Sequence, residues 1–586
     1  MKKIVATSLV SLMLCFSFAS CGDSTTQTPT NPTETPMLSL TDNAADPKGA
    51  PDYSASTKKL NMYAFLGPTD GSAATTSNGT KIRTQDFRTK ERYQEYKDCG
   101  FDVLLLLGNN AGSYSGAGYW ADVTEENMEE LKAKELEAYN KTGADSYTKG
   151  LKMNLDLSAE VGLKTIVFDH RVHQMTTVET SLIKEEGKEA QPIVVNCANG
   201  VNYTAPFEEN EKLIWETTYK EDGSIKSFGT YEQYDINGRL AIQTEIKNYR
   251  MQFEDEADLE RTLEVWTSPY MNHSAFYGMS MFDEPANPKL KAVGQVDKAL
   301  TKLDPDIFVQ TCLLPYYGGN SSILSVSNAQ EFKNYINLYL DETQSEYFGY
   351  DYYPMTMDGD TTSMQGTYLY CLQMSAELAR ENNCEWEIII QTYAQNNYLR
   401  EVGYADVDMQ VNLSLAFGAY NIGYFTYWMW ENKTGWPNYC AIMDDYGNKI
   451  LYDEVQKVNA EAKELAKIIL NYDYEKTQLR YTDISAPAWY RNVTESELDN
   501  VKSFESTGNT LVNQMYDKEK NCRGYMVVNV GDPAVDNTSR TTLEFEGFEN
   551  VMIVRNGKTT YRKLNQGKIT AYLAEGESVF LIPYNA

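Results

Sequence analysis

Histidine and positive charge are scarce in this chain. Its 586 residues include 3 His, and 52 Lys and Arg stand against 83 Asp and Glu, which gives a formal net charge of -31. So few imidazoles argue against a His-rich metal site. The negative charge repels phosphate backbones and anionic lipid head groups, which argues against nucleic-acid binding and against electrostatic membrane binding. The length exceeds one ordinary core, so we expect two or more domains.

Motifs for disulfides and for dinucleotides are also missing. None of the nine Cys residues forms a C-x-x-C pair, and Cys99, Cys371 and Cys384 lie inside apolar periodic segments. This placement favours buried free thiols over a disulfide framework. No G-x-G-x-x-G follows the first predicted strand, so a dinucleotide-binding fold has no support. The sequence therefore predicts no metal and no other cofactor.

The N-terminus carries a short apolar run. Lys2 and Lys3 precede the run over residues 4–18, and small residues then lead to Cys21. This pattern is typical of a secretory signal, and the run is too short for a durable membrane span. It resembles bacterial lipoprotein precursors, although Phe18 stands where Leu is usual. The resemblance implies cleavage before Cys21, acylation of its thiol and a protein anchored to the membrane outside the cell. The alternative is an ordinary secreted protein with an incidental Cys.

The rest of the chain divides into a tether, a large central domain and a C-terminal domain. Residues 22–55 are rich in Thr and Pro and predict a disordered tether. After residue 472 short alternating runs with turn signals such as Asn556-Gly557 predict a separate all-β, sandwich-like domain over 473–586. Within the central domain, residues about 180–248 are polar and charged and predict an inserted β excursion.

Eight short apolar or β-branched runs alternate with helical stretches across residues 56–472. Such runs are expected of strands buried on both faces. Gly100 and Gly162 precede two of them and fit helix C-caps. Eight strand-helix units in order predict an α/β fold of the TIM type, a (β/α)8 barrel. The predicted strands are residues 60–66, 101–107, 163–169, 276–282, 307–314, 347–353, 387–392 and 422–430.

The fourth predicted strand ends abruptly in Asp283-Glu284-Pro285. Burying an unpaired carboxylate costs several kcal/mol, roughly, so two acids at a strand end suggest a use. In a β/α barrel the active site lies at this end of the strands. Adjacent like charges raise the pKa of one of the two groups. We therefore interpret Glu284 as a catalytic acid, assisted by Asp283.

Other strand ends add acids, amides and aromatics to the same rim. Asp351 is the candidate second acid, or else a hydrogen-bonded support for neighbouring loops. Asp169 could contact substrate or simply pair with Arg171. Such a mixture suits a sugar-cleaving site, because aromatic rings stack on sugar faces and carboxylates supply acid and charge. The candidate substrate-binding residues are Asn109, Asp169, His170, Tyr353, Gln391, Tyr393, Trp428, Trp430 and Glu431.

Residues 60–470 resemble the clan-A glycoside hydrolases. In that clan the acid/base Glu follows an Asn at the end of strand four, and Asp283-Glu284-Pro285 has Asp in place of the Asn. The resemblance implies that Glu284 is the acid/base and that Asp283 contacts the sugar 2-hydroxyl. The clan places its nucleophile Glu at the end of strand seven, where this chain has Gln391, while Glu387 stands at the wrong end of that strand. The usual retaining mechanism therefore does not carry over whole.

Three groups could take the place of the missing nucleophile. Asp351 is favoured, and Glu431 is a second possibility. The third is an N-acetyl group of the substrate held by an acid pair, as in hexosaminidases that have adjacent Asp-Glu after strand four. Tyr350-Asp351 is also similar to a Tyr-Asp pair on strand six of chitinases.

These residues predict a surface-anchored glycoside hydrolase that acts on a poly- or oligosaccharide. Its partners would be a carbohydrate substrate and a membrane reached only through the lipid anchor. Three alternatives stay open. The barrel could bind glycans without cleaving them, as the missing strand-seven Glu suggests. It could be a substrate-assisted N-acetylhexosaminidase using Asp283 and Glu284, or a non-glycosidase such as a lyase, since a fold alone does not set the chemistry.

Overall fold

The structure is a computed structural model. It describes residues 43–68, 86–106, 116, 123–140, 146–175, 256–285, 287–317, 326, 328–359, 361–395, 398–428, 441–444, 446–482, 487–535 and 538–586, and short strands between 178 and 245.

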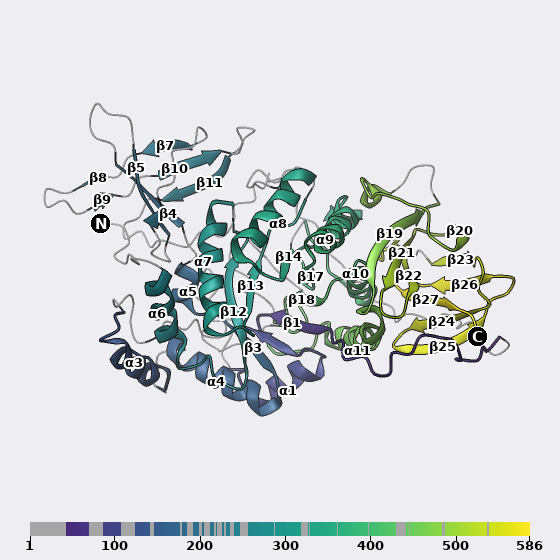
Figure 1. Cartoon of the computed structure of the whole chain (residues 1–586), viewed down its shortest axis with the longest axis horizontal. Helices are drawn as coiled ribbons and strands as arrows, with labels where there is room; N and C mark the ends of the chain where they lie inside the picture. Colours follow the sequence, from purple (N-terminus) through teal and green to yellow (C-terminus); the bar gives the residue numbers. More distant parts are fainter. Residues whose placement is uncertain are drawn as a thin grey trace. The chain divides into compact units, whose positions relative to one another are not determined.

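Eight parallel strands form the central sheet, in the order β13-β12-β3-β2-β1-β18-β17-β14. The Leu313 N–H donates to the Gly349 carbonyl at 2.8 Å, and this contact joins the two outer strands into a closed barrel. The predicted (β/α)8 barrel is confirmed (Figure 1). The strands are β1 Asn61–Phe65, β2 Val103–Leu105, β3 Lys164–Val167, β12 Phe276–Asp283, β13 Phe308–Cys312, β14 Tyr347–Asp351, β17 Glu385–Gln391 and β18 Asn421–Phe425.

Helices lie between consecutive barrel strands and cover the outside of the barrel (Figure 1). In the first of them the Thr89 hydroxyl accepts a hydrogen bond from the Arg92 N–H, Tyr93 and Tyr96 are buried, and Gly100 follows at φ +101°. Thr89 caps the helix, the two tyrosines form its buried face, and Gly100 follows its end as predicted. The helices are α1 Lys90–Asp98, α3 Met128–Asn140, α4 Ser146–Val161, α5 His170–Met175, α6 Glu256–Thr267, α7 Asn287–Leu303, α8 Ala329–Thr343, α9 Tyr368–Asn382, α10 Tyr404–Ala416 and α11 Tyr452–Ile469.

Glu387 places a polar side chain inside the apolar barrel. This residue is 1% exposed, and its Oε1 accepts a hydrogen bond from the Tyr63 hydroxyl at 3.0 Å. Gly349 on the neighbouring strand provides the space, because a Cβ there would lie 2.2 Å from the Glu387 Cγ. Burial raises the pKa of Glu387 to about 7. Its place in the first half of β17 agrees with the prediction that it stands away from the strand ends that form the site.

Small antiparallel sheets lie between α5 and α6, in the stretch where the sequence predicts an insertion. One sheet has the order β4-β5-β6, another β11-β10-β7, and β8 pairs with β9. These strands are β4 Val178–Ile183, β5 Gln191–Cys197, β6 Asn202–Tyr203, β7 Glu211–Trp215, β8 Thr218–Tyr219, β9 Ile225–Ser227, β10 Thr230–Tyr234 and β11 Leu240–Glu245.

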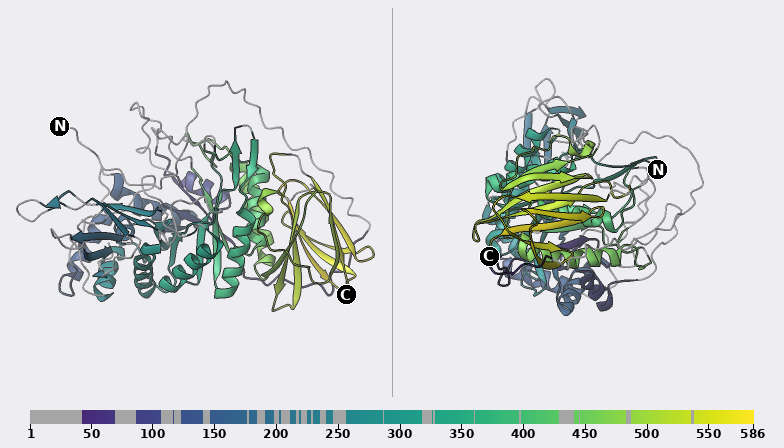
Figure 2. Two further views of the ribbon diagram at one scale, coloured as in Figure 1. Left: turned by 90° about the horizontal axis from the view of Figure 1, so that it is seen from above. Right: turned by 90° about the vertical axis from the view of Figure 1, so that its right-hand side faces the viewer.

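The C-terminal part is an all-β domain of two antiparallel sheets (Figure 2), as the sequence predicts. A separate apolar core lies between the sheets and includes Val512, Tyr525 and Leu543. The six-stranded sheet contains β19 Asp473–Arg480, β21 Thr510–Asp517, β22 Cys522–Asn529, β27 Ser578–Tyr584, β24 Asn550–Arg555 and β25 Lys558–Lys563. The other sheet contains β20 Val501–Ser506, β23 Ser539–Phe545 and β26 Lys568–Leu573, and the 3-10 helix η1 spans Ala488–Tyr490.

The described part of the predicted tether packs against the C-terminal domain. The Ala45 N–H donates to the Tyr561 carbonyl at 3.2 Å, and the Tyr53 hydroxyl donates to Asp517 Oδ2 at 2.9 Å. Residues 43–55 therefore differ from the free tether expected there. Main-chain hydrogen bonds and the buried Tyr53 hold this polar segment on the domain. The remainder of the tether, and Cys21, lie outside the described residues.

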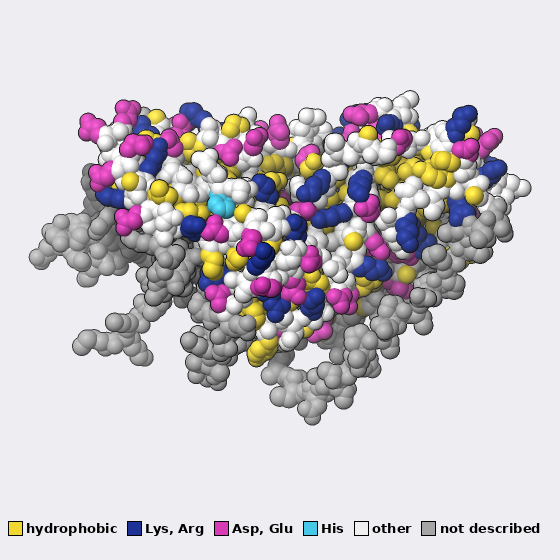
Figure 3. Space-filling model, turned by 90° about the horizontal axis from the view of Figure 1, so that it is seen from below, with side chains coloured by type: hydrophobic (Ala, Val, Ile, Leu, Met, Phe, Trp, Pro, Cys, Tyr) yellow, Lys and Arg dark blue, Asp and Glu magenta, His cyan; other side chains and the backbone are white. Residues whose placement is uncertain are grey.

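Charges of both signs alternate over the face shown in Figure 3. On this face the acidic side chains are interspersed with Lys and Arg. Within the described ranges we find no helix with the length and apolar character that crossing a bilayer requires.

Candidate functional site

Three neighbouring strand ends bring acidic groups together around one thiol. Asp283, the last residue of β12, is opposite Cys312 on β13, and Asp351 ends β14. The Cys312 thiol donates a hydrogen bond to Asp351 Oδ1 at 3.5 Å, and Asp283 is the register partner of Cys312 on the neighbouring strand. Cys312 therefore ends the strand that lies between the strands of the two acids. This arrangement follows directly from the barrel, in which the ends of adjacent parallel strands meet at one rim.

The surroundings favour the protonated form of both acids. Burial, followed by the negative charge of Asp351, raises the pKa of Asp283 to about 7. Asp283 nevertheless keeps surface that is exposed to solvent, so water reaches this residue. Burial also raises the pKa of Asp351, although hydrogen bonds from Tyr353 and Cys312 oppose the shift. Near neutral pH the pair is thus suited to share one proton.

Cys312 contributes as a hydrogen-bond donor. Burial, and then the charges of Asp351, Asp283 and Glu284, raise the pKa of the thiol well above its ordinary value. Because thiolate is the reactive form of cysteine, this thiol is not a nucleophile at neutral pH. It stays protonated and fixes the Asp351 carboxylate.

Glu284 has a left-handed backbone, with φ +47°. For a residue with a Cβ this conformation costs on the order of 1–2 kcal/mol, and such strain concentrates at functional sites. The Glu284 N–H donates to the Cys312 carbonyl at 2.7 Å, and the Tyr335 hydroxyl donates to the Pro285 carbonyl at 2.6 Å. These bonds hold the turn directly after the strand. The half-buried carboxylate lies near enough to raise the pKa values of Tyr317 and Tyr393, after burial and Asp351.

Aromatic rings form a wall beside the acids. The Tyr353 and Tyr393 rings are 5.1 Å apart and perpendicular, and both contact Phe425, with ring centroids at 5.7 and 5.0 Å. Burial and the Asp351 charge raise the pKa values of both tyrosines, so their hydroxyls stay protonated. Both side chains are half-buried, which leaves part of each ring accessible. Rings with a polar tip can pack on a sugar face and donate to its hydroxyls.

Gln391 occupies the strand-seven position with no exposed surface. Its Oε1 accepts from the Met355 N–H at 2.9 Å. Its Nε2 donates to the carbonyls of Met355, Tyr393 and Arg400 at 3.3, 3.1 and 3.2 Å. The whole amide is therefore used by main-chain groups of two loops. In this structure Gln391 joins loops and is not positioned to touch substrate.

Asp169 is also withdrawn from solvent. It is 0% exposed and accepts hydrogen bonds from Arg171 Nη2 and the Tyr270 hydroxyl, both at 3.0 Å. Arg171 Nη1 donates to Glu135 at 2.8 Å, which completes a buried charge cluster. This geometry fits the alternative in which Asp169 pairs with Arg171. Its neighbour His170 is half-buried, and burial lowers its pKa.

Of the remaining predicted substrate-binding residues, one is buried and the others lie outside the residues that the structure describes. Trp428 is 0% exposed, and its ring lies 4.8 Å from that of Phe87 in the core. Its surface is therefore used in packing. Asn109, Trp430 and Glu431 lie outside the described residues.

Sequence reasoning missed Cys312, Tyr317 and Phe425. Cys312 ends the fifth strand, and a search of every strand end would have included it. Phe425 ends β18, but a Phe in an apolar run gives no sign that it faces a site rather than the core. Among the residues described, no group of three His, Cys, Asp or Glu side chains is arranged to hold a metal ion.

No protein-family model matches the chain, and no curated protein matches it. Several solved glycoside hydrolases are similar in overall structure. An Anoxybacillus α-amylase has TM-score 0.40 and 10% identity, covering 90% of this chain and 98% of its own. A GH27 β-L-arabinopyranosidase from Geobacillus stearothermophilus has TM-score 0.41 and 11% identity, covering 92% and 100%. A family 5 glycoside hydrolase from Bacteroides vulgatus has TM-score 0.42 and 8% identity, covering 90% and 89%.

The contacts of Gln391 predict that the substitution Gln391→Glu destabilises the protein. A carboxylate here would face three carbonyls, and we expect a loss of about 2–4 kcal/mol in the free energy of unfolding at pH 7. The folded state would raise the pKa of the new acid. The deficit should therefore shrink as the pH falls from the raised folded pKa toward the unfolded value near 4.3, and it should change little below that value. Thermal unfolding at pH 4 and pH 7 measures this.

Gln330→Glu, on the exposed first turn of α8, is the matched control and should change the unfolding temperature little at either pH. Wild-type stability in the Gln391→Glu protein at pH 7 would contradict the proposed role of this amide.

Proposed function

We propose that this chain is a glycoside hydrolase that cleaves a poly- or oligosaccharide. The observation that carries the proposal is the strained Glu284, at φ +47° directly after β12 and beside Asp283, with Asp351 at the end of β14 on the same rim. A protein keeps a backbone strain of this kind where the position of the side chain matters.

Each acid has a role in the proposed reaction. Glu284 gives a proton to the leaving glycosidic oxygen and takes one back from the water that completes hydrolysis. Asp351 supplies the negative charge that stabilises the cationic sugar ring in the transition state. Protonated Asp283 donates a hydrogen bond to the substituent at the sugar 2-position, while the Tyr353 and Tyr393 rings bind the sugar face.

A substrate-assisted variant of the reaction has one supporting observation. Gln391 is committed to main-chain groups, so the described part of the strand-seven end supplies no nucleophile. A substrate N-acetyl group could then attack the anomeric carbon while Asp283 orients it and Glu284 protonates the leaving oxygen. Backbone strain occurs at ligand-binding sites as well as at active sites, so the Glu284→Gln experiment below is what separates the glycan-binding alternative from the hydrolase.

We also propose that the protein is exported and anchored through lipid on Cys21. What supports this is the signal-like start of the sequence with Cys at the cleavage position. In bacteria fed labelled palmitate, the full-length protein should take up label and the Cys21→Ala protein should not. Equal labelling of both proteins would contradict the anchor.

Replacing Glu284 by Gln keeps the shape of the side chain and removes the acid. We expect kcat for release of reducing sugar to fall by about 10²–10⁴ while glycan binding persists. Glu385→Gln, on the exposed start of β17 at the opposite end of the barrel, is the matched control and should keep the parent rate. A parent that binds a broad glycan panel without cleaving any member would support the binding alternative instead. Cleavage confined to N-acetylated sugars would favour the substrate-assisted reaction.

The raised pKa of Asp283 predicts the pH dependence. The proposed mechanism needs this acid protonated, so kcat/KM should decline as the pH rises through about 7. In Asp283→Asn the amide imitates the protonated acid, and this decline should disappear or move to higher pH. Profiles of kcat/KM for both proteins between pH 5 and 9 measure the effect. An unchanged profile would assign the decline to another group.

A further inference from the structure

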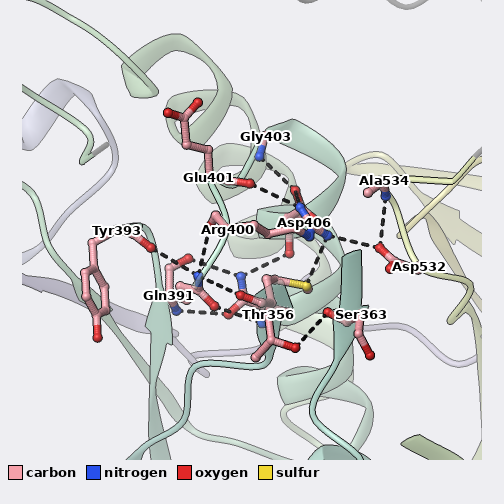
Figure 4. Close-up of polar contacts among 12 residues, drawn as sticks. Thr356, Ser363, Gln391, Tyr393, Arg400, Glu401, Gly403, Asp406, Asp532 and Ala534 are labelled. Carbon is pink, nitrogen blue, oxygen red and sulfur yellow. Dashed lines mark hydrogen bonds and ion pairs between the residues drawn. The ribbon is translucent and has the colours of Figure 1, made fainter. Parts of the chain in front are cut away.

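Arg400 joins the barrel to the C-terminal domain through a buried charge cluster. It follows β17 and is 7% exposed. Its Nη1 donates to Asp406 Oδ2 at 2.8 Å, at the start of α10. Its Nη2 donates to Asp532 Oδ1 at 3.1 Å, in the loop after β22 of the C-terminal domain (Figure 4). One cation therefore lies between two carboxylates that are each 5% exposed.

The same residue reaches the candidate site through its backbone. The Arg400 carbonyl accepts a hydrogen bond from Gln391 Nε2 at 3.2 Å, and its N–H donates to the Met355 carbonyl at 3.2 Å. Gln391 also bonds the Tyr393 carbonyl and both main-chain groups of Met355 (Figure 4). Tyr393 is a wall residue, and Met355 stands two positions after the wall residue Tyr353. A shift of Arg400 would therefore move the loops that carry Tyr353 and Tyr393.

A small hairpin strengthens this connection. Strands β15 Met355–Asp358 and β16 Thr361–Met364 pair with each other directly after Tyr353 and Pro354. The Met357 N–H donates to the Tyr398 carbonyl at 2.8 Å, so the hairpin is bonded to the segment that precedes Arg400. The two loops that hold Tyr353 and Tyr393 therefore form one bonded unit.

We infer that Asp532 is a positioning residue for the proposed reaction. Asp406 alone suffices to pair with Arg400 within the barrel. The second carboxylate draws the guanidinium toward the C-terminal domain, and a buried acid left without its cation is strongly unfavourable. This contact adds to the apolar packing between the domains, and it holds the Tyr353–Tyr393 wall at one distance from the acids. The C-terminal domain then belongs to the catalytic unit. The inference rests on the proposed function for its consequence, but not for its geometry.

The geometric part is tested without substrate, by hydrogen exchange on the full chain. In Asp532→Ala we expect the amides of Met357 and Arg400 to exchange about tenfold faster, because their hydrogen bonds open more often. The matched control is Gln373→Ala. Gln373 Oε1 accepts from the Thr494 N–H at 2.7 Å and its Nε2 donates to the Thr494 carbonyl at 2.9 Å, a separate bond between the domains. That variant should speed exchange at Thr494 and leave Met357 and Arg400 unchanged.

Asp532→Asn keeps an oxygen that can accept from Arg400 and from the Ala534 N–H, which lies 3.0 Å from Oδ1. Because the amide lacks the negative charge that attracts the guanidinium, Asp532→Asn should still speed exchange at Met357 and Arg400, by about threefold, and it serves if Asp532→Ala does not fold. Unchanged exchange at Met357 and Arg400 in both Asp532 variants overturns the inference, whatever the activity of the parent protein.

The functional part uses a double-mutant cycle with Tyr393→Ala. Asp532→Ala alone should lower kcat/KM by about tenfold to a hundredfold, because small displacements of a binding group cost rate. In the Tyr393→Ala background it should cost little more, since the wall that it positions is already gone. Equal losses in both backgrounds would show a general structural effect and overturn the positioning role. A parent without glycosidase activity would refute the proposed function, while the exchange result would still decide the contact between the domains.

Discussion

Negative charge concentrated at the rim of the barrel is the constraint on which the candidate site depends. Asp283, Glu284 and Asp351 come from two strands that are separated by the one ending in Cys312. Ionised carboxylates at the ends of such close strands repel each other, and the protein interior screens that repulsion poorly. The protonated thiol on the strand between them and the raised pKa of Asp283 are the responses that the structure shows. A site built in this way is ready to hold and release a proton near neutral pH.

The aromatic wall beside these acids is held through main-chain hydrogen bonds made by Gln391 and Arg400. Gln391 uses its whole side chain on main-chain atoms, and Arg400 connects the same atoms to Asp406 and Asp532. Hydrogen bonds to main-chain groups hold a loop in place irrespective of the side chains it presents. The strand-seven glutamine is therefore part of the support for the site, and the proposed chemistry has to come from the other strand ends.

The sequence predicted the elements well and several individual roles poorly. Continuous apolar runs identified all eight barrel strands, because strands buried on both faces need them. Asp169 and Trp428 stand at the correct strand ends, yet one pairs with Arg171 and the other packs on Phe87. Residues 43–55 have the composition of a tether, yet Tyr53 docks on Asp517. In each case a partner distant in sequence decided the outcome, and local patterns carry no information about such partners.

By itself the sequence determined the barrel, the β domain that follows it and the strand end that carries Asp283 and Glu284. Those features depend on local periodicity and on the rule that parallel strand ends meet at one rim. Only the tertiary structure decided that the Cys312 thiol donates to Asp351, that Glu284 is strained and that Gln391 is fully engaged. Burial, pKa and hydrogen-bond satisfaction depend on which groups from distant parts of the chain come within a few ångströms of one another.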